Sequence, residues 1–252
     1  MEIDGTTALV TGAGSGLGKA TAELLTARGA RVVAFDRDSA QLDDLVARLG
    51  VTRLIAVSGD VTSEADVTRA LHEAGGSLAS VVHCAGIGPS ARILSRSGTH
   101  ELELFDRVIR VNLSGSFNVL RLAAAEMAKR QVREGEDCGV VILTSSIAAF
   151  EGQIGQVAYS ASKGGVVAMT LAAARDLARH RIRVNAIAPG IFDTALLGTV
   201  SDDVRAQLAQ SVPYPARLGQ AGEYAALAVH IVENQMLNGA VIRLDAALRM
   251  SP

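Results

Sequence analysis

The sequence predicts an α/β fold built on a doubly wound, mainly parallel seven-stranded sheet with helices on both faces. Short apolar runs alternate with longer amphipathic stretches along the chain, as expected of strands joined by crossover helices. Apolar residues make up 49% of the composition, aromatic residues only 3%, and Trp is absent. Such a composition is typical of the aliphatic core around buried parallel strands. The 252 residues suit a single domain that spans residues 1–252.

Seven short segments have the apolar, β-rich composition of strands. The stretches between the first six are long enough for crossover helices, which parallel neighbours require. Residues 20–28 divide into an apolar and a polar face and predict a helix, whereas the charged residues 129–137 predict a solvated helix end and loop. The predicted strands are 7–11, 31–36, 53–57, 80–84, 139–144, 183–187 and 240–244.

Charge and cysteine content limit the partners that the chain can have. The formal net charge is -2 and no block of Lys or Arg occurs, so nothing favours nucleic acid or an anionic membrane, and a small molecule is the expected partner. Cys84 and Cys138 are the only cysteines, too few for a disulfide framework and too scattered for a metal site. The sequence has no secretory leader and no run of about 20 apolar residues. We expect a soluble cytoplasmic protein that binds no metal.

A glycine-rich turn separates the first predicted strand from the first predicted helix. Residues 11–18 read Thr-Gly-Ala-Gly-Ser-Gly-Leu-Gly and place Gly12, Gly16 and Gly18 in this turn. Without Cβ atoms the turn lets a pyrophosphate approach the backbone, and the helix N-terminus presents N–H groups to that anion. An ordinary tight turn is the alternative, but the strand–helix–strand setting favours a Rossmann-type dinucleotide site.

Asp36 closes the second predicted strand, about 20 residues beyond the glycines. A carboxylate at this spacing accepts hydrogen bonds from ribose hydroxyls and repels a 2′-phosphate, which favours NAD over NADP. The neighbouring Arg37 could pair with a 2′-phosphate, but no basic residue in the glycine turn supports that alternative.

Tyr159 and Lys163 stand four residues apart in a segment with helical periodicity, so their side chains share one helix face. An ammonium beside a phenol favours the phenolate, and we expect Lys163 to lower the pKa of Tyr159 so that it serves as the acid/base. Ser146 lies thirteen residues earlier, at the end of the fifth predicted strand. Its hydroxyl is placed to hydrogen-bond a substrate oxygen, although a turn-capping role is the alternative.

Together these residues resemble the short-chain dehydrogenase/reductase family. Residues 11–18 match its cofactor motif, Tyr159-x-x-x-Lys163 matches its active-site motif, and Ser146 stands at the spacing of its catalytic serine. The resemblance implies that Asn112 completes a catalytic tetrad by holding a water in the proton relay through a kinked helix. From the residues alone, Asn112 is a buried polar group of a helix.

The resemblance also implies a set of cofactor contacts. Asp60 and Val61 would meet the adenine, and Phe192 with Thr194 would meet the nicotinamide end. The full set is Gly12, Ser15, Gly16, Leu17, Gly18, Asp36, Asp60, Val61, Cys84, Ala85, Gly86, Tyr159, Lys163, Phe192 and Thr194.

One motif departs from the family pattern. Many members have Asn-Asn-Ala-Gly after the fourth strand, where this chain has His83-Cys84-Ala85-Gly86. The change concerns a local hydrogen-bond network rather than the chemistry. His83 could serve as an alternative base, but a strand this apolar favours a hydrogen-bonded core histidine.

Within the family, residues 148–156, 158–165, 237–245 and 249–252 resemble the type 2 3-hydroxyacyl-CoA dehydrogenases, a branch that also accepts hydroxysteroids. The resemblance implies interconversion of 3-hydroxyacyl-CoA and 3-ketoacyl-CoA with NAD(H), and a substrate contact from Gln153 beside those of Ser146 and Tyr159. It also implies a homotetramer with the last strand and the C-terminal residues at an interface. Gln153 as a loop residue that satisfies backbone groups is the alternative.

An apolar segment lies where the family keeps a mobile lid, near residues 190–213. Such a lid suits an acyl chain or a steroid, although the same stripe could pack on the core. Rival functions are a hydroxysteroid or other alcohol dehydrogenase, a ketoacyl thioester reductase, and a non-catalytic NAD-binding subunit; the complete tetrad argues against the last. The stripe consists of Leu196, Leu197, Val200, Val204 and Leu208.

Overall fold

The computed structural model describes residues 1–96, 98–194, 197–198 and 201–251. Its centre is a seven-stranded sheet in the order β3-β2-β1-β4-β7-β8-β9, in which every neighbouring pair is parallel. The strands are β1 Thr7–Thr11, β2 Arg31–Asp36, β3 Leu54–Ser58, β4 Leu78–His83, β7 Gly139–Thr144, β8 Ile182–Pro189 and β9 Val241–Leu244. The predicted doubly wound parallel sheet is therefore confirmed.

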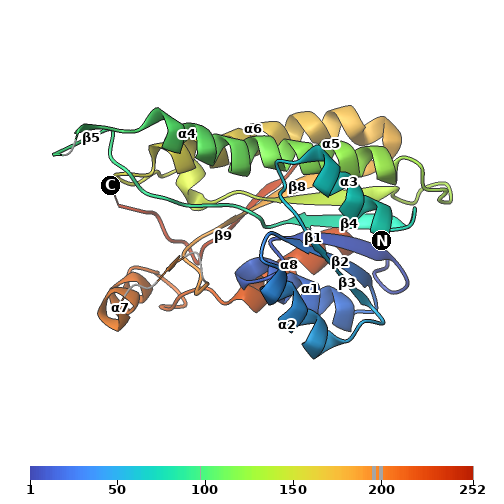
Figure 1. Ribbon diagram of the computed structural model, residues 1–252. Coiled ribbons are helices and arrows are strands. Elements are labelled where there is room, and N and C mark those ends of the chain that lie inside the picture. Colours follow the sequence, from blue (N-terminus) through green and yellow to red (C-terminus); the bar gives the residue numbers. More distant parts are fainter. Residues whose placement is uncertain (97, 195–196, 199–200, 252) are drawn as a thin grey trace.

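Helices cover both faces of this sheet, as Figure 1 shows. One layer contains α3 Glu64–Glu73, α4 Leu102–Ile109, α5 Gly115–Met127 and α6 Val157–Leu177, and the other contains α1 Gly16–Ala27, α2 Ser39–Leu49 and α8 Ala221–Glu233. Each layer buries its own aliphatic cluster against one face of the strands. The predicted helix over 20–28 corresponds to α1, and α5 ends at Met127, just before the stretch 129–137 that was expected to be a helix end and loop.

The remaining elements are short. A hairpin of β5 Leu94–Ser95 and β6 Gly98–Thr99 projects from the body, and a π-helical turn, Arg110–Ser114, joins α4 to α5. Two 3-10 turns, Ile147–Ala149 and Ala178–His180, flank α6, and α7 Asp202–Gln210 lies apart from both helix layers.

The order of the sheet reverses between β1 and β4. The chain runs outward from β1 through β2 to β3, and then returns to β4 on the opposite side of β1. The loops that follow β1 and β4 therefore diverge at the carboxyl edge and leave a crevice, the usual ligand site of an open α/β sheet. Both the glycine turn and residues 84–86 stand at this point.

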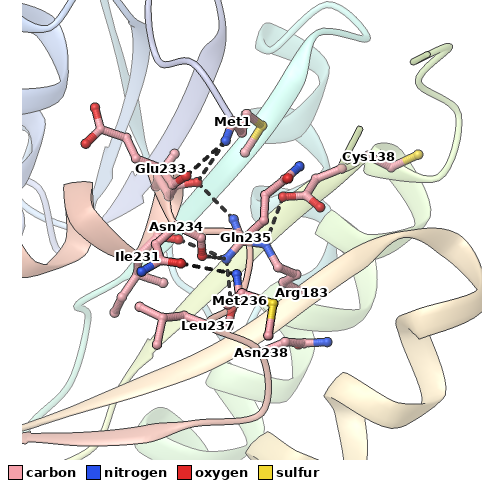
Figure 2. A network of polar contacts seen from close by, with 12 residues as sticks. Met1, Cys138, Arg183, Ile231, Glu233, Asn234, Gln235, Met236, Leu237 and Asn238 are labelled. Carbon is pink, nitrogen blue, oxygen red and sulfur yellow. Dashed lines mark hydrogen bonds and ion pairs between the residues drawn. The ribbon is translucent and has the colours of Figure 1, made fainter. Parts of the chain in front are cut away.

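A buried arginine joins the first residues of β8 to the C-terminal end of α8 (Figure 2). The side chain of Arg183 is 5% exposed, and its Nε atom donates to Asp137 at 2.8 Å. The last carbonyl groups of a helix have no partners within the helix, and an arginine is well suited to satisfy them. Arg183 donates to the carbonyl oxygens of Ile231, Val232, Asn234 and Leu237.

Candidate active site

The turn after β1 has the backbone conformation that only glycine adopts without strain. Gly12 and Gly16 have φ angles of 67° and 51°, in the left-handed region that is disfavoured for residues with a Cβ atom. A Cβ atom on Gly18 would overlap the carbonyl oxygen of Gly12. The turn therefore leads directly into α1, whose N-terminus faces the crevice beside β4.

A cleft of about 370 Å³ opens at this turn and extends along the crevice. Its walls are largely backbone and small side chains, whose N–H groups suit a pyrophosphate. Asp36 stands at the end of β2, where its carboxylate suits the hydroxyls of a ribose. Twelve of the fifteen residues expected to contact a cofactor line it together: Gly12, Ser15, Gly16, Leu17, Gly18, Asp36, Asp60, Val61, Cys84, Ala85, Gly86 and Thr194.

The carboxylate of Asp36 is held in place by the backbone around it. Its Oδ2 atom accepts from the N–H of Gly14 at 2.9 Å, and its Oδ1 atom accepts from the N–H of Asp38 at 3.1 Å. The guanidinium of Arg37 lies 3.9 Å from the carboxylate of Asp60. Both Asp36 and Arg37 line the cleft, and the hydrogen bonds from Gly14 and Asp38 fix the orientation of the Asp36 carboxylate there.

A second pocket of about 350 Å³ adjoins the cleft. Leu17, Cys84, Gly86 and Thr194 line both cavities, so the two form one continuous site. Tyr159, Lys163 and Phe192, the three expected cofactor contacts outside the first cleft, line this second pocket together with Ser146 and Gln153. The structure therefore gathers the predicted reactive side chains beside the predicted cofactor cleft.

Tyr159 and Lys163 lie in the first turns of α6 and face the same pocket, as their spacing predicts. The Nζ atom of Lys163 lies 5.7 Å from the centroid of the Tyr159 ring and donates to the carbonyl oxygen of Thr144 at 2.7 Å. Burial lowers the pKa of Lys163 to about 8.

The expected depression of the pKa of Tyr159 is not found in the protein groups alone. Burial raises this pKa, and a hydrogen bond with Ser146 offsets part of the rise. The expectation was wrong because the loss of hydration around the phenol outweighs the influence of its neighbours. Tyr159 is thus held as a phenol, the form that donates a proton.

Ser146 lies two residues beyond the end of β7 and caps the 3-10 turn Ile147–Ala149. Its hydroxyl accepts from the N–H of Ala148 at 3.1 Å, so the turn-capping role is realised. The side chain is 9% exposed and lines the pocket beside Tyr159. One hydroxyl therefore both caps the turn and reaches the site. Ser145 instead donates to the carbonyl oxygen of Lys163 at 3.0 Å and secures α6 to the sheet.

Asn112 lies in the π-helical turn, which supplies the expected kink. Its amide is fully buried: the Oδ1 atom accepts from the N–H of Ile87 at 2.8 Å, and the Nδ2 atom donates to the carbonyl oxygen of Ile87 at 2.8 Å and to Ser162. The side chain is thus occupied by backbone groups behind the pocket. Asn112 fixes the loop that follows Gly86, and it does not itself line the pocket.

His83 is buried, as expected of a core histidine. Its Nδ1 atom lies 2.8 Å from the hydroxyl of Thr11, and its Nε2 atom has no hydrogen-bond partner among the described residues. Burial, assisted by Lys163, lowers the pKa of His83 to about 3. The imidazole therefore stays neutral behind the site and does not line the pocket, which weighs against it as a base.

The sequence did not predict a network of buried hydroxyl groups that lies behind Lys163. The hydroxyl of Thr144 donates to the carbonyl oxygen of His83 at 2.6 Å and lies 2.7 Å from the hydroxyl of Tyr224 on α8. Since the Thr144 proton is already used, Tyr224 donates to Thr144, and Cys84 donates weakly to Tyr224. Burial raises the pKa of Cys84 to about 11, so its thiol is not reactive. No local sequence pattern predicts a contact between residues that are 80 positions apart.

The predicted apolar lid reaches the pocket in part. Leu197 and Leu208 line it, whereas Val204 on α7 is 40% exposed and does not. Leu196 and Val200 lie outside the described residues. Gln153 lines the pocket, and its Nε2 atom donates to the carbonyl oxygen of Ser251 at 3.1 Å.

The described part of the chain holds no group of three or more His, Cys, Asp or Glu side chains arranged for a metal ion. Within the same residues, no helix combines the length and apolar character needed to cross a membrane.

Known proteins resemble this chain over nearly its whole length. The sequence model of the short chain dehydrogenase family matches residues 6–205. The 3-hydroxyacyl-CoA dehydrogenase type-2 of Bos taurus is 51% identical over 99% of this chain and 97% of its own, and that of Homo sapiens is 49% identical with the same coverage. The crystal structure of 3-hydroxyacyl-CoA dehydrogenase type-2 from Mycobacterium avium superposes with a TM-score of 0.94 at 41% identity, over 98% of this chain and 97% of that one.

These matches run through the glycine turn, the segment from β7 to Ser146 and the helix that carries Tyr159 and Lys163. Sequence, topology and site geometry thus agree, and the chain belongs to the short-chain dehydrogenase family of oxidoreductases.

Proposed function

We propose that the protein is an NAD(H)-dependent dehydrogenase that interconverts 3-hydroxyacyl-CoA and 3-ketoacyl-CoA. The single observation that carries this proposal is the continuity of the two cavities, which brings Ser146, Tyr159 and Lys163 beside the cleft at the glycine turn. The names of the relatives and the partly apolar second pocket support a thioester with an acyl chain as the substrate.

NAD is the proposed cofactor because of the position of Asp36. The backbone N–H groups of Gly14 and Asp38 orient its carboxylate at the cleft, where it would accept hydrogen bonds from the adenosine ribose and oppose a 2′-phosphate. When bound, the nicotinamide would exchange a hydride with the carbon that carries the substrate oxygen. Thr194 lies close to the glycine turn, since a Cβ atom added to Gly16 would lie 3.2 Å from the Cβ atom of Thr194.

The chain's own groups would manage the proton and the charge. For reduction of a ketone, Tyr159 would donate its phenolic proton to the substrate oxygen, and Ser146 would stabilise the charge that develops there. Lys163 would act beside them as the group that restores the proton, since burial brings its pKa to about 8. Asn112 would fix the main chain beside this proton relay through its hydrogen bonds to Ile87. Gln153 would contact the substrate in the second pocket.

We further infer that residues 1–252 form one domain, because both helix layers pack on a single sheet. The segment near 190–213 would act as the substrate lid, with Leu197 and Leu208 as its contacts. A homotetramer in the cytoplasm is the proposed state. β9 is an edge strand of the sheet, and α5 and α6 share an apolar groove beside the exposed side chain of Phe117; a second copy would cover such surfaces.

The decisive experiment follows NADH oxidation with acetoacetyl-CoA, beside a 3-ketosteroid and a ketoacyl carrier-protein mimic. We expect the highest kcat/KM with acetoacetyl-CoA. No turnover of acetoacetyl-CoA with rapid turnover of the steroid would refute the acyl-CoA proposal and leave the family assignment intact. No turnover of any alcohol or ketone, with NADH still bound, would instead support a non-catalytic NAD-binding subunit.

A further inference from the structure

We propose that the C-terminal tail, defined as residues 245–251, forms a fixed wall of the substrate pocket and that Met250 sets the length of the acyl chain that fits. The inference rests on the proposed function, because it names the part of that site that selects among acyl substrates. Met250 is the described tail residue that lines the pocket. The C-terminal tail lies on the same side of the molecule as α7 in Figure 1.

A bidentate ion pair attaches the tail to the loop after Ser146. Two nitrogen atoms of Arg243, at the end of β9, donate to the two carboxylate oxygens of Glu151 at 2.7 and 3.0 Å. Glu151 also accepts from the N–H of Met250 at 3.4 Å. Paired N–H donors in this geometry give both strength and a fixed orientation. Glu151 thus holds the backbone of Met250 directly.

The turn at the start of the tail is held in a conformation that its residues disfavour. Ala246 and Ala247 have φ angles of 49° and 63°, in the left-handed region where a Cβ atom is strained. Asp245 holds this turn, since its carboxylate accepts from the N–H of Ala247 at 3.1 Å and from Arg243 at 2.6 Å. Such a turn persists only where its surroundings determine it, and the two hydrogen bonds of Asp245 supply part of that constraint.

Apolar packing fixes the other side of the tail. Leu248 is 4% exposed and forms a small core with Ile147 and Val212, against which Met250 packs in part. Ile147 follows Ser146 in sequence, and Val212 follows α7. The tail therefore joins the loop of the reactive serine to the far end of the lid segment.

The position of Met250 makes it the specificity-determining residue of this wall. Leu248 is committed to the small core, and the Arg249 side chain is paired with Asp245 and Glu151 at the surface. Met250 presents a flexible apolar side chain to the pocket that also contains Ser146 and Tyr159. An acyl chain that extends from the reacting carbon would meet this side chain.

The test is the chain-length profile of Met250→Ala and Met250→Trp, measured as kcat/KM with NADH and 3-ketoacyl-CoAs of four, eight and twelve carbons. A methylene in an apolar pocket changes specificity by about tenfold or more. We expect Met250→Ala to raise the ratio of the twelve-carbon to the four-carbon value by at least about tenfold, and Met250→Trp to lower it. Met236→Ala is the matched control, because Met236 is 90% exposed, and its ratio should equal that of the unmodified protein.

Glu151→Ala tests whether the ion pair positions Met250. We expect the same shift of the chain-length ratio, through KM rather than kcat for the four-carbon substrate, with the Kd for NADH unchanged. In the double variant Glu151→Ala/Met250→Ala the shift should not exceed that of Met250→Ala, because the two residues act on one wall. Glu64→Ala is the control, since it removes an exposed ion pair with Arg121.

Unchanged profiles in both Met250 variants, each with an unaltered Tm, would overturn the proposal. Failure of the proposed function has a different signature, namely no turnover of any acyl-CoA by the unmodified protein. In that case the same variants are assayed with a small ketone and with the 3-ketosteroid. Met250→Ala should then raise the ratio of kcat/KM for the steroid to kcat/KM for the small ketone. An equal ratio in that series would also overturn the role of Met250.

Discussion

The ammonium group of Lys163 donates a 2.7 Å hydrogen bond to the main-chain carbonyl oxygen of Thr144. The hydroxyl of Thr144 in turn lies 2.7 Å from that of the buried Tyr224. The position of Lys163 beside Tyr159 is therefore determined by β7 and α8 as well as by its own helix. The pair places a phenol whose pKa is raised next to an amine whose pKa is about 8.

Tyr159→Phe should nearly abolish turnover while NADH still binds. The change removes the transferable proton and leaves the ring in place, and the loss of a positioned acid/base costs about 100-fold or more. Steady-state kcat/KM and NADH fluorescence titration measure the two effects separately. Retention of most activity would show that a group other than Tyr159 supplies the proton.

Asp36→Ala should relax a strong preference for NAD(H) over NADP(H). The carboxylate opposes a 2′-phosphate and accepts hydrogen bonds from the ribose, so its removal should weaken NADH and strengthen NADPH. The ratio of kcat/KM for the two cofactors is the measurement, with Asp38→Ala as the neighbouring control. Equal efficiency of NADH and NADPH in the unmodified protein would contradict the ribose-binding role of Asp36.

His83→Asn should make the protein less sensitive to acid. The pKa of His83 falls from 6.5 to about 3 on folding, so between these values the unfolded chain binds the extra proton. The contribution of His83 to the free energy of unfolding is fully present above pH 6.5 and decreases as the pH falls. At pH 4.5 the loss is about 2 to 3 kcal/mol. Urea unfolding at pH 7 and pH 4.5 measures the difference, and His72→Asn, at an exposed position on α3, is the control. An equal loss in His83→Asn and the unmodified protein would contradict the assignment.

Gly18→Ala should destabilise the protein by more than about 2 kcal/mol, because the added Cβ atom would overlap a backbone oxygen that cannot move aside. Gly222→Ala is the matched control on α8. A Cβ atom there meets nothing within 4 Å, and alanine in an exposed helix should add about 0.5 to 1 kcal/mol. Thermal unfolding of both variants gives the comparison. A Gly18 variant as stable as the unmodified protein would mean that the glycine turn is less tightly packed than described.

Much of the fold could be predicted because its strands are apolar runs with clear limits. β1, β2 and β7 have the predicted bounds, β3, β4 and β9 differ by one or two residues, and β8 extends beyond its predicted limits at both ends. The β5–β6 hairpin and the π-helical turn were not predicted. The hairpin is exposed and follows no apolar periodicity, and a π turn differs from an α-helix only in a local hydrogen-bond shift.

The site was predictable where spacing along one element decides the geometry, as for Tyr159 and Lys163 on α6. It was not predictable where distant segments meet. Thr144 and Tyr224 are 80 residues apart, and Glu151 and Arg243 are 92 apart, yet each pair is hydrogen-bonded. The pKa of Tyr159 shows the same limit, because the burial that raises it depends on the whole pocket rather than on the neighbouring lysine.

The guanidinium of Arg183 links two elements in local unfolding of the native state. Its partners lie 46 to 54 residues away and include the last carbonyl groups of α8. Separation of α8 from β8 would leave a buried charge with its hydrogen bonds broken, which is far more costly than fraying a helix end. The amide protons of β8 and of the final turn of α8 should therefore exchange with solvent in a single cooperative opening, so that the last third of the chain behaves as one unit of native-state unfolding.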